Sequence, residues 1–267
     1  MKPKTIITLL AGIISCSASA TEFMAGFDLQ GKISRQQYTD GSTSTTSRLA
    51  LQPWITRGDW MFYAELPFEG RESQHQSTQQ VYVTGKNGRI IRRIPAQTLL
   101  TTRQQNTDGI ADASIGVSYS FAGLNTQWQH SFAMDYKFDN GDTSDALGSG
   151  TRETAISTST RYQIAFISMM AQLGYTIVEA PSQIDVLNFA YGSVGATWKI
   201  HQHLKSSLSY NNQTKPYSTA PDQASVQLNA EWKAMDILKL SIAYNDYLSS
   251  SISLPQNDVS VSATLLF

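Results

Sequence analysis

Apolar and polar residues alternate along most of the chain, in segments of about ten residues separated by turn-like sequence. In residues 60–68, Trp60, Phe62 and Leu66 share one face, and Tyr63 and Glu65 the other. A period of two predicts β-strands with one apolar face. Twelve such strands are expected, at about 23–34, 47–55, 60–68, 112–121, 128–138, 156–164, 167–177, 191–200, 204–210, 226–232, 238–245 and 259–267.

The connections between these segments alternate in length. Tight connections are expected at 57–59, 123–125, 163–166, 201–203 and 234–236, and longer ones at 40–45, 70–109, 140–153, 179–186, 211–222 and 246–256. Outer-membrane barrels have short periplasmic turns and longer extracellular loops. The pattern therefore predicts an all-β fold, a transmembrane antiparallel up-and-down β-barrel of about twelve strands. Its termini would be periplasmic, and a long extracellular loop would span about 70–109.

A soluble β-sandwich would also show alternation, but it would not require aromatic residues at the strand ends. Trp60, Trp128, Trp198 and Trp232 lie near such ends, where an aromatic girdle meets lipid headgroups. The terminal Phe267 follows alternating apolar residues and resembles the C-terminal signal that outer-membrane barrels present to their assembly machinery. These features favour the barrel.

The N-terminus is typical of a cleaved secretory signal peptide. Lys2 and Lys4 precede an apolar run at 5–14, and the small residues 17–20 then provide a cleavage site after Ala20. The mature domain would be 21–267. An alternative is lipoprotein processing at Cys16, the one cysteine of the chain. The expected location is the cell outer membrane, with lipid, lipopolysaccharide and the barrel assembly machinery as partners. The net charge of -1 gives no case for a nucleic-acid partner.

Charged residues fall on the face of the strands that should line the lumen. They are Asp28, Lys32, Glu65, Asp112, Asp135, Lys137, Arg161, Lys199, Lys205, Glu231, Lys239 and Asp258. The two signs are nearly balanced. One interpretation is that these groups neutralise one another and fill space, and the other is that they select solutes in a pore.

Two of the long connections carry further candidate features. Residues 81–84 and 89–92 flank Asn87-Gly88, which predicts a β-hairpin within the 70–109 loop. This extracellular basic flap carries Lys86, Arg89, Arg92 and Arg93, which would attract anionic lipopolysaccharide or simply be solvated. Asp139, Asp142 and Asp145 are spaced somewhat like a calcium loop but lack its bidentate glutamate, so a solvated turn is the preferred interpretation.

The histidines of the sequence give little support to the alternative of an enzymatic barrel. His130 and Ser131 are adjacent, so they would face opposite sides of a strand and could not pair as base and nucleophile. His75 falls in the longest loop. His201 and His203 share a tight turn without nearby carboxylate or cysteine partners. No catalytic residue, metal site or cofactor is therefore expected.

Three segments resemble an outer-membrane family named for the meta pathway of phenol degradation. They are 108–119, then Asp139-Asn140-Gly141-Asp142 with Leu147-Gly148-Ser149-Gly150, and Gly174-Tyr175 with the later Tyr191-Gly192. The strand-end motif here begins Phe138-Asp139-Asn140-Gly141 instead of containing the Pro-Thr-Gly common in that family. The resemblance implies a transporter-type barrel, often linked to aromatic or hydrophobic compounds.

The function expected from these observations is passive or facilitated passage of a small molecule, whose identity the sequence does not give, through a porin-like channel. The alternative is a non-conducting barrel whose extracellular loops bind a surface partner or support the cell envelope. The two differ in whether the lumen is open, and twelve strands do not decide this.

Overall fold

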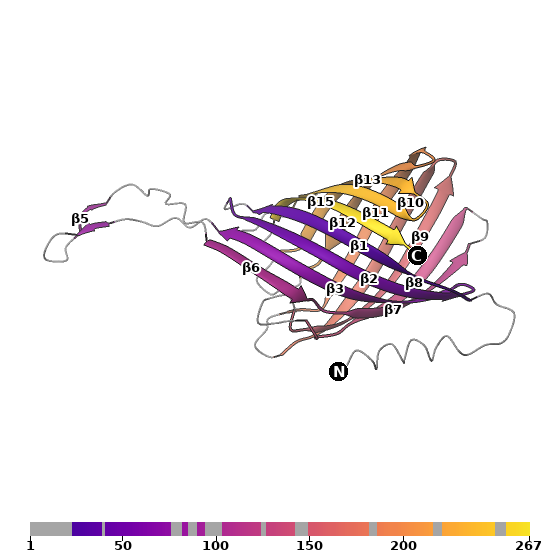
Figure 1. The fold of residues 1–267 in the computed structure, drawn as a ribbon, viewed down its shortest axis with the longest axis horizontal. Coiled ribbons are helices and arrows are strands. Elements are labelled where there is room, and N and C mark those ends of the chain that lie inside the picture. Colours follow the sequence, from indigo (N-terminus) through magenta and orange to yellow (C-terminus); the bar gives the residue numbers. More distant parts are fainter. Residues whose placement is uncertain are drawn as a thin grey trace.

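The computed structural model describes residues 23–38, 41–75, 82–84, 90–93, 103–123, 127–141, 149–181, 186–215, 221–248 and 255–267. All of the regular structure in these ranges is β-sheet (Figure 1). The strands are β1 Phe23–Tyr38, β2 Thr43–Arg57, β3 Trp60–His75, β4 Tyr82–Thr84, β5 Ile90–Arg93, β6 Arg103–Ile110, β7 Ser114–Ala122, β8 Trp128–Lys137, β9 Arg152–Ile164, β10 Ile167–Glu179, β11 Phe189–His201, β12 Leu204–Gln213, β13 Gln223–Met235, β14 Leu238–Tyr247 and β15 Pro255–Leu266.

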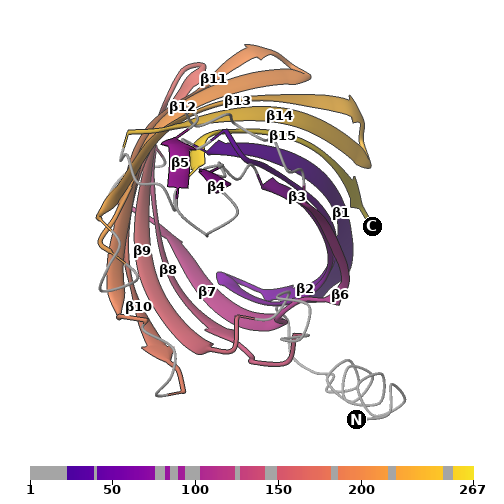
Figure 2. The same cartoon turned by 90° about the vertical axis from the view of Figure 1, so that its left-hand side faces the viewer.

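The sheet closes on itself into a barrel of twelve antiparallel strands with one extra strand, β6. Neighbouring strands follow the order of the chain, from β1, β2 and β3 to β7 and on to β15, which pairs with β1. Seen from one end, the strands form a ring (Figure 2). The predicted up-and-down barrel is confirmed.

Residues 70–75 and 103–109, expected to belong to the long loop, lie in strands instead. They lengthen the sheet beyond the predicted end of the third strand, because β3 pairs with β7 over 60–65 and with β6 over 68–75. These residues are polar on both faces, so they carry no alternation by which a strand could be recognised. Within the same connection, β4 and β5 form the predicted hairpin, with Tyr82 opposite Arg93.

The outer face of the barrel is a belt of exposed apolar side chains. Phe62, Ile115, Leu173 and Val261 are examples, each between 48% and 67% exposed. At one end of the belt, Trp60 packs on Tyr119 and Trp128 on Tyr162, with ring centroids 4.8 and 4.6 Å apart. An apolar band edged by aromatic rings is the arrangement that a lipid bilayer requires of a spanning barrel. Among the described residues, no helix is long and apolar enough to cross a membrane.

The two ends of the barrel differ in their connections. At the tight-turn end lie the turns at 58–59, 165–166, 202–203 and 236–237, together with Phe23 and Phe267. The first of these turns depends on Gly58, whose φ of 60° is unfavourable for residues with a side chain. The longer connections lie at the opposite end, here called the loop end. Pro53 lies within β2, and the strand continues through it; only the ladder to β3 is interrupted at 52–53.

Candidate functional site: the lumen of the barrel

The side chains of each strand alternate between the apolar belt and the lumen, so residues out of phase with the belt face inward. By this criterion, eleven of the twelve residues expected to line the lumen lie on the inner face: Asp28 and Lys32 in β1, Glu65 in β3, Asp135 and Lys137 in β8, Arg161 in β9, Lys199 in β11, Lys205 in β12, Glu231 in β13, Lys239 in β14 and Asp258 in β15. The twelfth, Asp112, lies between β6 and β7, outside any strand.

The inner wall over β1, β2 and β3 holds a network of charges that largely compensate one another. Arg48 forms ion pairs with Glu65 and, at 3.7 Å, with Glu69. Gln52 donates a 2.7 Å hydrogen bond to the other oxygen of Glu65. Neither Arg48 nor Glu69 was singled out from the sequence. Glu69 lies just past residue 68, where the third strand was expected to end. On this wall, the interpretation of mutual neutralisation fits the contacts.

Two tyrosines lie flat against the inner wall over glycines. Tyr63 donates a hydrogen bond to Asp135, and its ring covers Gly116, where a Cβ atom would overlap the ring. Tyr191 covers Gly174 in the same way. Tyr63 lies directly opposite Gly116 across the β3–β7 ladder, and Tyr191 lies directly opposite Gly174 across the β10–β11 ladder. The glycines therefore leave room for the tyrosine rings against the inner wall.

Asp112 joins β7, β8 and β9 at the loop end of the barrel. Its carboxylate accepts hydrogen bonds from the backbone of Gly141 at 2.8 Å and from the backbone and hydroxyl of Ser149 at 2.8 and 2.6 Å. Lys137 lies 3.8 Å away and also pairs with Glu153. The side chain of Asp112 is only 6% exposed. It therefore holds Gly141 and Ser149 against the wall, and two of the three segments that carried the family resemblance meet here.

The surroundings of Asp112 favour its ionised form. Burial acts to raise the pKa of this carboxyl, but the hydrogen bonds from Ser149 and Gly141 and the charge of Lys137 outweigh it, so its pKa lies below the ordinary value. A carboxylate held in this way is a structural anchor.

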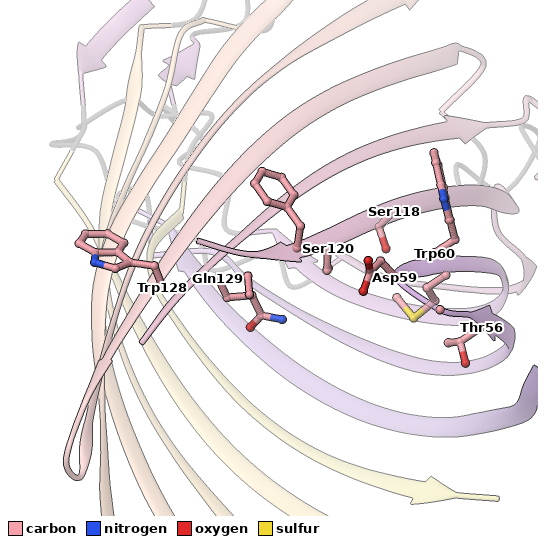
Figure 3. Close-up of a pocket in the computed structure, with 11 residues that line it drawn as sticks. Thr56, Asp59, Trp60, Ser118, Ser120, Trp128 and Gln129 are labelled. Carbon is pink, nitrogen blue, oxygen red and sulfur yellow. The ribbon is translucent and has the colours of Figure 1, made fainter. Parts of the chain in front are cut away.

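The lumen at the tight-turn end has one nearly neutral sector. A cavity of about 500 Å³ there is lined by Thr56, Ser118, Ser120 and Gln129, with Asp59 as its one charged residue. Figure 3 shows Asp59 grouped with the two serines, while Trp60 and Trp128 stand at either side of them. These residues come from β2, β3, β7, β8 and the turn at 58–59.

The opposite sector of the same end is strongly cationic. A cavity of about 700 Å³ is lined by residues of β9 to β14, among them Arg161, Lys199, Lys205, Lys233 and Lys239, with Glu231 as its one carboxylate. Lys233 was not singled out from the sequence. The signal was present, because Lys199 and Lys205 flank one tight turn with the same spacing at which Lys233 and Lys239 flank another.

Of the histidines, His130 lies on the outer face of β8, whereas His203 lines the cationic cavity at the tight-turn end. His130 bonds to Thr160 at 3.0 Å on the outer face, whereas Ser131 bonds to Ser159 at 2.7 Å on the inner face. They therefore lie on opposite faces, as the alternation predicts. The rings of His201 and His203 lie 5.8 Å apart. No group of three or more possible metal ligands occurs among the described residues.

Several sequence predictions fall outside the described residues. These are the signal peptide at 1–20, the alternative site at Cys16, and Lys86, Arg89, Asp142 and Asp145. Arg92 and Arg93 belong to β5.

The fold resembles solved outer membrane channels, although the sequence does not. An outer membrane channel from Pseudomonas putida F1 matches with a TM-score of 0.61 and 10% identity, over 94% of this chain and 97% of that one. The KdgM porin matches with a TM-score of 0.53 and 8% identity, over 90% and 99% of the two chains. No family model and no curated protein matches the sequence. The chain has the β-barrel fold of these channels.

Proposed function

We propose that this protein is an outer-membrane channel through which small polar molecules diffuse. The observation that carries the proposal is the state of the barrel interior. Among the described residues no large side chain is fully buried, and the buried apolar residues are only Ala50, Ala111 and Ala113. A barrel of about eight strands is just wide enough to be filled by its own side chains. This twelve-stranded barrel has cavities of about 500 and 700 Å³ at its tight-turn end, each lined in part by inward-facing residues.

The lining supports hydrophilic solutes. Hydroxyl, amide and charged groups face the lumen on almost every strand, for example Ser118 on β7, Ser159 on β9 and Asn229 on β13. The family resemblance implied aromatic or hydrophobic compounds, but a wall of this kind offers them little apolar contact. Membership of that family itself stays a proposal. Its support is that Asp112 binds Gly141 and Ser149, which belong to two of the resembling segments.

The orientation follows from the connections. We place the tight-turn end in the periplasm and the loop end outside the cell, because bacterial barrels keep their short turns on the periplasmic side. Export would use the signal peptide at 1–20, and assembly would use the C-terminal Phe267. The outer part of the loop end, including the basic flap, would then meet lipopolysaccharide.

The test is single-channel conductance of the refolded protein in a planar bilayer. A second protein replaces residues 76–102 by a short glycine-serine linker, which the pairing of His75 with Arg103 allows without disturbing β3 or β6. Stepwise conductance from the intact protein is expected. Silence from both proteins, with folding established by a heat-dependent shift in gel mobility, would contradict the channel and favour a non-conducting barrel.

A further inference from the structure

We propose that the cationic sector of the tight-turn end is a binding site for small organic anions, and that it makes the channel selective for carboxylate- or phosphate-bearing solutes. We call this sector, formed by Arg161, Lys199, Lys205, Lys233 and Lys239, the basic crescent. The inference rests on the proposed channel function and names its substrate class.

The register of the strands places lysines of the crescent directly opposite one another. Lys199 lies directly opposite Lys205 across the β11–β12 ladder, and Lys233 lies directly opposite Lys239 across the β13–β14 ladder. Directly paired residues share a face and have Cβ atoms about 5 Å apart, so like charges there repel each other. Two such pairs occur on adjacent hairpins, and all four lysines face the lumen. An anion bound between them would relieve this repulsion.

The crescent has more cations than carboxylates to pair with them. Glu231 lies 3.6 Å from Lys205, and Lys233 pairs with Asp236, which is itself 97% exposed on the turn. Arg161, Lys199 and Lys239 form no ion pair with any residue that the structure describes. The cavity lining therefore holds five cations and one carboxylate.

Two cations of the lumen toward the loop end differ from those of the crescent, because each is matched by two carboxylates: Arg48 pairs with Glu65 and Glu69, and Lys137 pairs with Asp112 and Glu153. The opposite sector of the tight-turn end is nearly neutral (Figure 3). Excess positive charge is thus concentrated on one side of one end. Because these side chains face the lumen and not the lipid, bilayer headgroups do not account for it.

The lining also fits the remainder of a small organic anion. Gln163, Ser168, Thr197, Ser207 and Asn229 line the same cavity and supply amides and hydroxyls for hydroxyl groups of a solute. Arg161 can bind a carboxylate or phosphate through two parallel hydrogen bonds. A volume of about 700 Å³ suits a small molecule. The crescent would concentrate such solutes at the mouth and lower the barrier to their passage.

The test compares the reversal potential of the intact protein with that of a triple variant, Arg161→Gln, Lys199→Gln and Lys239→Gln, in a potassium chloride gradient across zwitterionic bilayers. The wild-type channel is expected to prefer chloride over potassium. The variant should lose this preference by about threefold or more, since one charge at roughly 6 Å in water changes ion occupancy by about that factor. The control, Arg35→Gln, Arg152→Gln and Lys215→Gln, removes the same charge outside the crescent and should keep the preference.

A second measurement uses an anionic solute and its neutral counterpart. Swelling of proteoliposomes is followed with glucose and with glucuronate, which differ by a carboxylate. Faster entry of glucuronate, lost in the triple variant only, is the expected result. Conductance without anion preference, or equal loss in the control, would overturn the anion site while leaving the channel intact. Absence of both conductance and glucose entry from folded protein would overturn the channel itself.

Discussion

The ring of Phe267, the last residue, stacks on the ring of Phe27, with centroids 4.7 Å apart and planes inclined by 18°. Two backbone hydrogen bonds join the same residues: Phe27 N–H donates to Phe267 at 3.2 Å, and Phe267 N–H donates to Phe27 at 3.0 Å. The end of the chain therefore fastens β15 to β1 and completes the ring of strands at the tight-turn end.

The first prediction concerns this seam. Phe267→Ala should lower the yield of folded barrel and its stability, because a ring pair contributes about 0.5–1.5 kcal/mol beyond its buried area. Phe27→Ala should have a smaller effect on yield, since the terminal residue stays in place for assembly. The fraction with heat-dependent gel mobility measures both. Phe68→Ala, on an exposed belt residue, is the control, and an equal loss there would show that the seam has no special role.

The second prediction concerns Asp112. Asp112→Asn should destabilise the barrel by about 1.5–3 kcal/mol at neutral pH, because hydrogen bonds to a carboxylate are stronger than those to an amide. The folded-state pKa of this group is lowered, so its contribution is present above the ordinary carboxyl pKa and is lost as pH falls through the lowered value. Urea unfolding should therefore give a smaller difference between wild type and variant at pH 3 than at pH 7. A constant difference would contradict this account.

The third prediction concerns the tyrosines over glycine. In Gly174→Ala, the added Cβ would overlap the ring of Tyr191, which must then turn toward the lumen. Single-channel conductance should fall while the barrel still folds. Gly31→Ala is the matched control, because its Cβ meets nothing within 4 Å. Unchanged conductance in Gly174→Ala would mean that the ring at this level does not limit the pore.

The fourth prediction is that the lysines of the basic crescent lower the free energy of unfolding of the barrel. Lys199→Gln and Lys239→Gln each remove one member of a like-charged pair, so each should raise the free energy of unfolding by roughly 0.2–1 kcal/mol. The gain should shrink in high salt, which screens the repulsion. Urea midpoints at low and high salt are the measurement. If both variants were less stable than the wild type, the lysines would be structural and not held for an anion.

The alternation of apolar and polar residues predicted most of the strands, because lipid requires an apolar outer face on every spanning strand. The prediction failed where that constraint ends: Arg71 and Glu72 are in β3, but they lie past the belt, where either face can be polar. Within the site, the positions of Arg161 and Lys205 in the alternating pattern of their strands predicted that both side chains face the lumen. The alternation alone could not predict that Lys199 lies opposite Lys205, because this depends on the register across a turn. It also could not predict the hydrogen bond from Tyr63 to Asp135, because these residues are distant in the chain.

The free edge of β6 has a consequence for how deeply the protein sits in its membrane. Within the part of the chain that the structure describes, β6 pairs with β3 alone, and β8 pairs with β7 only as far as Ser114. If the other side of β6 stood in hydrocarbon, each amide and carbonyl group left without a partner there would cost several kcal/mol. We therefore expect the acyl chains on this side of the barrel to end near Ile110, with the β3–β6 ribbon clear of the lipid.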